Sequence, residues 1–352
     1  MRPPTPRPFD DASAAAARAH FDNLTKPPRS LGKLEDIGAW WCGATGAFPP
    51  KTPHPARLVT FAADHGVTAE GVSPYPSAVT GQMVRNFLGG GAAVNVFARH
   101  HGVALAVVDV GVGSSLADVS SSTHATFIDH RVRAGTGNMV RELAMTRDEA
   151  ERAIGVGISM AEAARADGIA VLGAGEMGIG NTTAAAAVFA AFAGMPGKLT
   201  AGRGTGVDDA GLARKVAAID AALALHKPDR DDAVGVLSAV GGLEIAAIAG
   251  LCLGGAAAGI PVVLDGFIST CGGLVASVLD RAVLPHLLVS HRSAENAHWA
   301  MSRYLGKEPV HDLDLRLGEG TGAVLAIDLI RLSVRVMSEM ATFSSANVSG
   351  PA

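Results

Sequence analysis

The chain has 352 residues, of which 48% are hydrophobic and 18% are charged, and its formal net charge at pH 7 is -4. These values exclude a wholly disordered chain, and the lack of a basic excess argues against a nucleic-acid-binding surface. The three cysteines have no Cys-x-x-Cys spacing, which favours free buried thiols in a reducing cytoplasm. Prolines and acidic residues stand near the N-terminus where a signal peptide needs an apolar run, so a cytoplasmic protein is expected.

In chain order, the N-terminal part predicts two helices, and the middle predicts strands that alternate with Ala-rich helices. The predicted helices are 14–24 and 31–42, then 181–193 and 212–224, and the predicted strands are 57–62, 103–110, 169–172, 261–264 and 286–289. Strands that are apolar throughout and alternate with helices indicate a mostly parallel sheet covered on both faces.

The most apolar stretch is residues 245–264, which contains four glycines and a proline. A buried helix followed by a buried strand fits this stretch better than a membrane span. A last long helix is predicted over 322–341. The sequence therefore predicts an α/β fold with a doubly wound sheet in a large lobe of approximately residues 52–295, and a small helical lobe that both termini form, approximately residues 9–45 and 296–345.

Ligands bind at the carboxyl ends of parallel strands, so the segment after the third predicted strand matters most. There Gly173, Gly175 and Gly178 match the G-x-G-x-x-G pattern of dinucleotide-binding proteins. That pattern expects an acidic residue about 20 positions later. No Asp or Glu occurs between Glu176 and Asp208, which argues against a nicotinamide-dependent oxidoreductase but leaves it as an alternative.

The same segment predicts a phosphate site. Residues 180–183, Gly-Asn-Thr-Thr, open a helix, where free backbone N–H groups and hydroxyl donors can hold one phosphate. The alternative is that Asn181 or Thr182 only caps the helix. Lys215 follows a glycine-rich segment and could neutralise the phosphate, although a solvated helix lysine is the commoner case.

A glycine-flanked carboxylate, Glu319, stands just before the last long helix. A ligand can reach such a group, and burial can adjust its pKa as a general base requires. The alternative is an acid placed to interact with the helix dipole.

Residues 63–83 mix polar and soft apolar side chains that could line a pocket for a flat aromatic ligand. A loop followed by an ordinary core helix is the alternative. No metal site is predicted, because His291 and His298 could share a helix face but lack a third ligand nearby.

Several segments together resemble one family, the nicotinate-nucleotide:dimethylbenzimidazole phosphoribosyltransferases of cobalamin biosynthesis. In chain order they are Leu24-Thr-Lys-Pro-Pro with Ser30-Leu-Gly, Ala63-Asp-His-Gly, Val79-Thr-Gly-Gln-Met-Val, Gly135-Thr-Gly-Asn-Met, Gly175-Glu-Met-Gly-Ile-Gly-Asn-Thr-Thr, Gly204-Thr-Gly with Asp208, Leu264-Asp-Gly-Phe, Ser290-His with Ser293-Ala-Glu, and Leu317-Gly-Glu-Gly-Thr-Gly-Ala. They span residues 24–323, nearly the whole chain. Arg29, Arg203 and Arg292 replace the usual Gly, Pro and Gln, which bears on base preference more than on reaction type.

The resemblance implies a Rossmann-like large domain with a small helical one, and a homodimer. It implies transfer of 5-phosphoribose from nicotinate mononucleotide to 5,6-dimethylbenzimidazole or a related base, without a metal or cofactor. Glu319 would be the general base, Glu176 would lie near the ribose, and Lys215 would add positive charge. The implied phosphate and ribose residues are Gly178, Gly180, Asn181, Thr182, Thr183 and Gly204, and the implied base-binding residues are Ser77, Gln82, Met83, Ser293, Gly320 and Thr321.

Two matters stay open at this point. A non-catalytic module that binds a nucleotide or base is a further alternative, and an ion-paired Glu319 away from the pocket would favour it. The sequence also leaves open which base is the physiological acceptor and whether a partner subunit contributes to the site.

Overall fold

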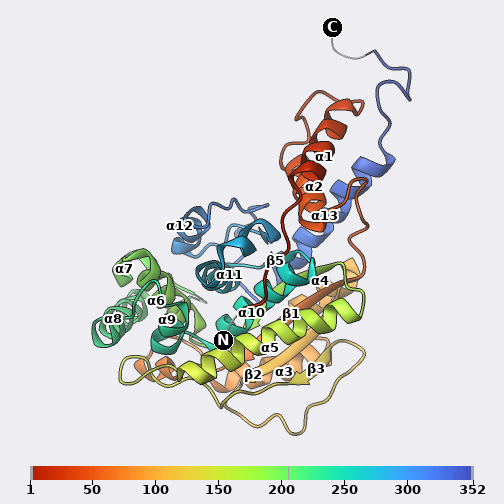
Figure 1. Ribbon diagram of the computed structural model, residues 1–352. Coiled ribbons are helices and arrows are strands. Elements are labelled where there is room, and N and C mark those ends of the chain that lie inside the picture. Colours follow the sequence, from red (N-terminus) through yellow and green to blue (C-terminus); the bar gives the residue numbers. More distant parts are fainter. Residues whose placement is uncertain (1–2, 205, 350–352) are drawn as a thin grey trace.

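Six parallel strands form one sheet in the order β3-β2-β1-β4-β5-β6 (Figure 1). The computed structural model describes residues 3–204 and 206–349. The strands are β1 (Ala56–Ala63), β2 (Ala104–Gly111), β3 (Thr126–Asp129), β4 (Val171–Met177), β5 (Val262–Leu264) and β6 (Leu287–Val289). This order reverses between β1 and β4, which is the arrangement of a doubly wound sheet with a ligand crevice at the reversal. The predicted α/β fold is confirmed.

Helices cover both faces of the sheet, and a separate apolar cluster fills each side. On one side lie α5 (Arg147–Ala166), α6 (Asn181–Ala193), α8 (Asp209–His226), α9 (Ala233–Val240), α10 (Leu243–Ala258), α11 (Phe267–Leu279) and α12 (Asn296–Tyr304). On the other lie α1 (Asp11–Asn23), α2 (Lys33–Thr45), α3 (Ala78–Gly89), α4 (Ala93–His101) and α13 (Thr321–Glu339). The short helices are η1 (Gly66–Glu70), α7 (Gly197–Thr200) and η2 (Arg281–His286).

The side chains of β1 alternate between the two faces of the sheet, which explains why most of its positions are apolar. Val59 and Phe61 point into one cluster, while Leu58 and Ala62 point into the other. Successive side chains of a strand face opposite sides, so a strand covered on both faces needs apolar residues at every position.

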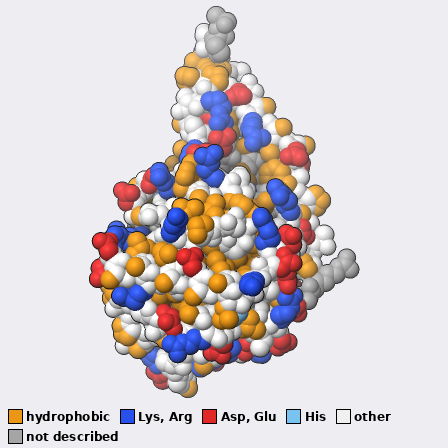
Figure 2. All heavy atoms as spheres, turned by 90° about the vertical axis from the view of Figure 1, so that its left-hand side faces the viewer, with side chains coloured by type: hydrophobic (Ala, Val, Ile, Leu, Met, Phe, Trp, Pro, Cys, Tyr) orange, Lys and Arg blue, Asp and Glu red, His pale blue; other side chains and the backbone are white. Residues whose placement is uncertain are grey.

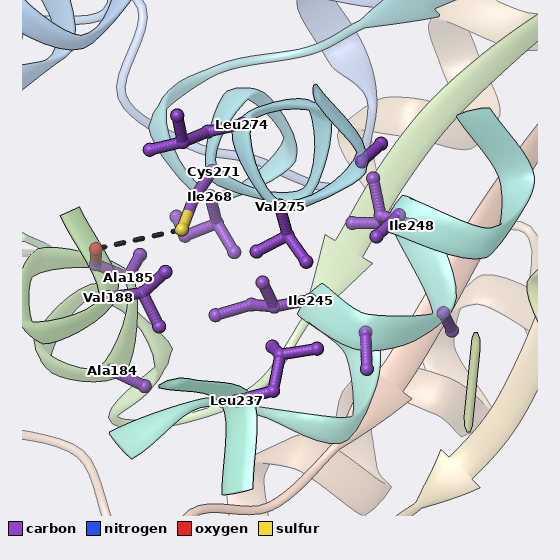
Figure 3. Close-up of a cluster of buried hydrophobic side chains, with 14 of the residues drawn as sticks. Ala184, Ala185, Val188, Leu237, Ile245, Ile248, Ile268, Cys271, Leu274 and Val275 are labelled. Carbon is purple, nitrogen blue, oxygen red and sulfur yellow. Dashed lines mark hydrogen bonds between the residues drawn. The ribbon is translucent and has the colours of Figure 1, made fainter. Parts of the chain in front are cut away.

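The helices α6, α10 and α11 pack together through a cluster of buried apolar side chains (Figure 3). Ile245 and Ile248 of α10 face Ile268 and Val275 of α11, and the Cys271 Sγ atom lies 3.7 Å from the carbonyl oxygen of Ala185. All three cysteines are free and buried, as predicted. The stretch predicted as a buried helix and strand is α10 followed by β5.

The terminal helices α1 and α2 pack together at the end of the molecule where α13 finishes (Figure 1). α13 starts against β1, β4 and β5 and runs out into this helical lobe, so one helix joins both parts. α12, which the predicted bounds assign to the small lobe, packs against α11 and α7.

The surface that carries α7 and α8 mixes positive and negative side chains (Figure 2). Hydrophobic side chains gather near the middle of this face, between charged ones. No helix in the described part of the chain is both long and apolar enough to cross a membrane.

Candidate active site

Polar side chains meet at the carboxyl ends of the strands, around the reversal between β1 and β4. His65 follows β1, Glu176 stands near the end of β4, Asp265 follows β5, and His291 follows β6. All four are buried. They share one edge of the sheet because all the strands are parallel.

β4 is longer than predicted, and this corrects the interpretation of the glycine pattern. The strand extends to Met177, so Gly173 and Gly175 lie inside it rather than in a loop. A β-carbon at Gly175 would lie 2.4 Å from the backbone oxygen of Glu319. Gly175 therefore allows the segment before α13 to approach the strand, and Gly173 lies against Ala323 of α13. Neither glycine belongs to a dinucleotide-binding loop.

The segment before α13 turns sharply at the predicted base. Gly318, Glu319 and Gly320 have φ values of +83°, +65° and +101°, in the left-handed region. A residue with a β-carbon is uncommon in this region, and such strained positions cluster at functional sites. The Thr60 hydroxyl donates to the Glu319 carbonyl at 2.9 Å and helps to hold the turn.

Asp265 fixes the same turn from the β5 side. Its carboxylate accepts hydrogen bonds from the backbone N–H groups of Gly320 (3.0 Å), Gly322 (2.7 Å) and Ala323 (3.1 Å) at the start of α13. Asp265 therefore performs the helix-terminus role that was the alternative for Glu319. Sequence reasoning missed it as a site residue, although it lies in one of the segments that carry the resemblance.

The Glu319 side chain points instead toward α4. Its Oε2 atom accepts a hydrogen bond from the Val94 N–H at 3.3 Å, near the first residue of that helix. Glu319 is only 5% exposed. Burial raises its pKa to about 7, and the Val94 N–H opposes this rise. A carboxylate with a pKa near 7 is poised to accept a proton at neutral pH.

Glu176 of β4 packs against Gly318, the residue that precedes Glu319. A β-carbon at Gly318 would be 2.3 Å from the Glu176 Oε1 atom, so the carboxylate packs directly against the turn. Burial, reinforced by the nearby charges of Asp265 and Glu244, raises the pKa of Glu176 to about 8. The Asn181 side-chain amide donates a hydrogen bond to Glu176.

Asn181 and Thr182 at the start of α6 line two pockets and do not cap the helix. Gly180 is the N-cap, at φ +93°, and no side chain among the described residues caps the helix. Asn181 bonds Glu176, and Thr182 accepts from Lys215. The Thr183 hydroxyl is buried and has no hydrogen-bond partner among the described residues. The capping alternative for Asn181 and Thr182 is therefore wrong.

Lys215 of α8 is buried, so the solvated-lysine alternative is also wrong. Its Nζ atom donates to Thr182 Oγ1 at 2.9 Å and to the Gly202 carbonyl at 2.8 Å. Burial lowers its pKa, and the negative charge of Glu295 opposes this shift. A pocket beside it is lined by Gly178, Gly180, Asn181, Thr182 and Gly204, which are predicted phosphate residues. Thr205 lies outside the described residues.

The predicted base-binding residues fall into three groups. Gly320 and Thr321 belong to the Glu319 turn, where the Thr321 hydroxyl donates to the Gly318 carbonyl at 2.9 Å. Ser293 lies on the wall of the pocket that also contains Glu176. Ser77 precedes α3 and its hydroxyl lies 3.0 Å from that of Thr68, while Gln82 is exposed and Met83 half-buried on α3.

The histidines lie differently from the expected helix face. His298 is in α12, whereas His291 precedes that helix and stacks on His311 with 5.7 Å between ring centroids. His65 pairs with Glu244 at 2.8 Å, and both side chains are buried. Among the described residues, no group of three or more His, Cys, Asp or Glu side chains is arranged to hold a metal ion.

Comparisons with known proteins agree with the geometry. A family model described as "Phosphoribosyltransferase" matches residues 7–348. The nicotinate-nucleotide–dimethylbenzimidazole phosphoribosyltransferase of Roseiflexus sp. (strain RS-1) is 50% identical over 343 residues, which are 97% of this chain and 96% of that protein. The enzyme of that name from Geobacter sulfurreducens is 51% identical over 341 residues, 97% of this chain and 95% of its own. The crystal structure of the Thermus thermophilus enzyme is similar with a TM-score of 0.90 and 46% identity, over 97% of this chain and 100% of that chain.

Proposed function

This chain belongs to the family of nicotinate-nucleotide–dimethylbenzimidazole phosphoribosyltransferases, and we propose that it performs the reaction of that name. It transfers 5-phosphoribose from nicotinate mononucleotide to 5,6-dimethylbenzimidazole or a related base. The products are α-ribazole 5′-phosphate and free nicotinate.

The observation that carries the proposal is a connected set of contacts that links three charged groups. The Glu176 carboxylate packs against Gly318, the residue before Glu319. Glu176 also bonds Asn181, and the next residue, Thr182, bonds Lys215. One carboxylate can take a proton, the other can face the ribose, and the ammonium can hold the phosphate. A phosphorylated ribose bound between them would be fixed at both ends.

The reaction needs side chains that accept a proton, and it does not need a strong electrophile to stabilise the leaving group. In the donor, nicotinate is attached as a pyridinium, so it departs as a neutral ring when the bond from its nitrogen to the anomeric carbon breaks. The acceptor nitrogen forms the new bond to that carbon from the opposite face. A β-linkage therefore becomes an α-linkage.

Attack leaves the acceptor ring cationic until its other nitrogen loses a proton. Glu319 accepts this proton in the proposal, because its buried carboxylate has a pKa of about 7 and its Oε2 atom bonds the backbone N–H of Val94 rather than a cation. A well-placed general base contributes roughly 10²–10⁴-fold to the rate.

Glu176 stabilises the positive charge that develops on the ribose. Its pKa of about 8 is that of a carboxyl without a cation nearby. A bound pyridinium or oxocarbenium-like centre favours the ionised form, so the carboxylate gains charge when the transition state needs it.

The phosphate is held away from the reacting bond. The N-terminus of α6, with the Lys215 ammonium beside Thr182, can bind a dianion there. Binding energy from such a remote group orients the anomeric carbon between the departing nicotinate and the acceptor ring.

We also propose that the enzyme works without a metal and as a homodimer. Both expectations rest on the resemblance, and the first is consistent with a departing pyridine ring that gains no negative charge. Sedimentation of the purified protein at several concentrations tests the second, and a monomer at micromolar concentration contradicts it.

Base exchange tests the proposal directly. The protein is mixed with nicotinate mononucleotide and dimethylbenzimidazole in excess EDTA, and free nicotinate and the riboside phosphate are followed by chromatography. The proposal predicts equal amounts of both products. Nicotinate without the riboside product would indicate hydrolysis, and no release from a folded protein would favour a non-catalytic binding module.

A further inference from the structure

Lys215 is a buried cation whose partners are neutral. Its Nζ atom donates to Thr182 Oγ1 and to the Gly202 carbonyl, and the side chain is almost fully buried. A buried charge is costly unless an opposite charge compensates it. If the proposed function holds, the donor phosphate provides that charge, and the site without donor needs another anion.

The carboxylate whose negative charge acts on Lys215 is that of Glu295, the residue that precedes α12. Its Oε1 atom accepts the Gly204 N–H at 2.5 Å. A β-carbon at Gly202 would lie 1.9 Å from its Oε2 atom, so the carboxylate fits because Gly202 has no side chain. Glu295 is 8% exposed. Its Oε2 atom is buried and has no hydrogen-bond partner within the described ranges.

Glu295 and Lys215 therefore hold the same short segment from two sides. Lys215 bonds the Gly202 carbonyl, Glu295 bonds the Gly204 N–H, and a β-carbon at Gly204 would lie 3.3 Å from Lys215 Nζ. Glu295 lines the pocket that contains Glu176, and Lys215 lines a second pocket that does not include Glu295. Gly204 lines both pockets. The Gly204 N–H is thus a donor that a phosphate beside Lys215 would also need.

We propose that the carboxylate of Glu295 takes, in the free enzyme, the position of one oxygen of the donor phosphate, and that the phosphate displaces it on binding. This inference rests on the proposed function for the identity of the donor. A carboxylate with one unpartnered buried oxygen is held weakly, because that oxygen has lost its water without gaining a donor. A phosphate monoester carries more charge and three acceptor oxygens, so it competes successfully where a singly charged anion does not.

Glu295 thereby acts as a specificity-determining residue. Its negative charge disfavours the binding of singly charged anions at the Gly204 and Lys215 donors, whereas a dianionic phosphate monoester displaces it. A donor without the 5′-phosphate leaves Glu295 in place, and its binding does not depend on the charge of this residue.

The test measures binding of inorganic phosphate by calorimetry in the full-length protein, without acceptor or turnover. Glu295→Gln keeps a side-chain oxygen for the Gly204 N–H but removes the charge. We expect its dissociation constant for phosphate to fall by about tenfold, because a like charge no longer opposes the anion. Asp312→Asn, which removes an exposed charge from the same face, should leave phosphate affinity within about twofold of the wild type. Affinity for nicotinate riboside should be unchanged in Glu295→Gln.

Glu295→Ala separates displacement from simple support of the segment. Displacement predicts that this variant also binds phosphate more tightly than the wild type does. The proposal is overturned if Glu295→Gln, with an unchanged melting temperature, binds phosphate no more tightly than the wild type does. It is also overturned if Glu295→Ala binds phosphate more weakly than the wild type does, even when Glu295→Gln binds it more tightly. The binding test measures no turnover, so its result is independent of the base-exchange assay. If base exchange fails but Glu295→Gln binds phosphate more tightly, the proposed function is contradicted and the displacement of Glu295 is still supported.

Discussion

The backbone oxygen of Glu319 packs against Gly175 so closely that a β-carbon there would lie 2.4 Å away. We predict that Gly175→Ala displaces the turn, lowers kcat by at least about tenfold, and destabilises the fold by roughly 1–3 kcal/mol. Gly155→Ala in α5 is the matched control, because nothing lies within 4 Å of its added carbon. The control should be neutral or more stable by roughly 0.5–1 kcal/mol. Wild-type kcat and melting temperature in Gly175→Ala would show that the contact is unimportant.

Asp265 holds the same turn by accepting three backbone N–H groups. Asp265→Asn replaces one acceptor oxygen with a donor, so at least one of these N–H groups loses its partner. We expect a loss of roughly 1–3 kcal/mol in the free energy of unfolding, and a fall in kcat with little change in the KM for nicotinate mononucleotide. Steady-state kinetics and thermal denaturation measure the two effects. A change in KM alone would mean that Asp265 acts on the donor and not on the position of Glu319.

Burial of Glu319 costs stability at neutral pH. Its pKa rises from an ordinary 4.5 to about 7 on folding, so the folded chain binds more protons than the unfolded chain between these values. The free energy of unfolding therefore falls as pH rises through this window, by up to roughly 3 kcal/mol. Glu319→Gln should be more stable than the wild type at pH 8 and equal to it near pH 4. Equal melting temperatures at both pH values would contradict the raised pKa.

The same pKa predicts how activity depends on pH. Glu319 is a base only when ionised, so kcat/KM for the acceptor should rise about tenfold per pH unit below its pKa of about 7 and level off above it. The residual activity of Glu319→Gln should lack this rise. A wild-type profile that is flat between pH 5 and 8 would exclude Glu319 as the titrating base.

The periodicity of the sequence predicted most of the sheet, because strands buried on both faces are apolar at every position. β3 was missed because it is a short edge strand whose side chains are half-buried or exposed. β4 was predicted too short, because glycines usually end a strand. Here Gly173 and Gly175 continue it, and tertiary packing against α13 supplies the reason.

The site was predicted less completely than the fold. Glu319 stands out in the sequence because glycines flank it, and Lys215 was identified only as a candidate because burial of a helix lysine depends on distant segments. Asp265 and Glu295 were missed as site residues, since each acts through backbone N–H groups more than 50 residues away in the chain. Such partners become visible only when the topology brings the carboxyl ends of the strands together.

The most direct test of the account compares Glu319→Gln with the wild type in base exchange between nicotinate mononucleotide and dimethylbenzimidazole. The account predicts that kcat falls roughly 10²–10⁴-fold while the dissociation constant of nicotinate mononucleotide changes by less than about threefold. A normal kcat in Glu319→Gln would contradict the assignment of Glu319 as the general base.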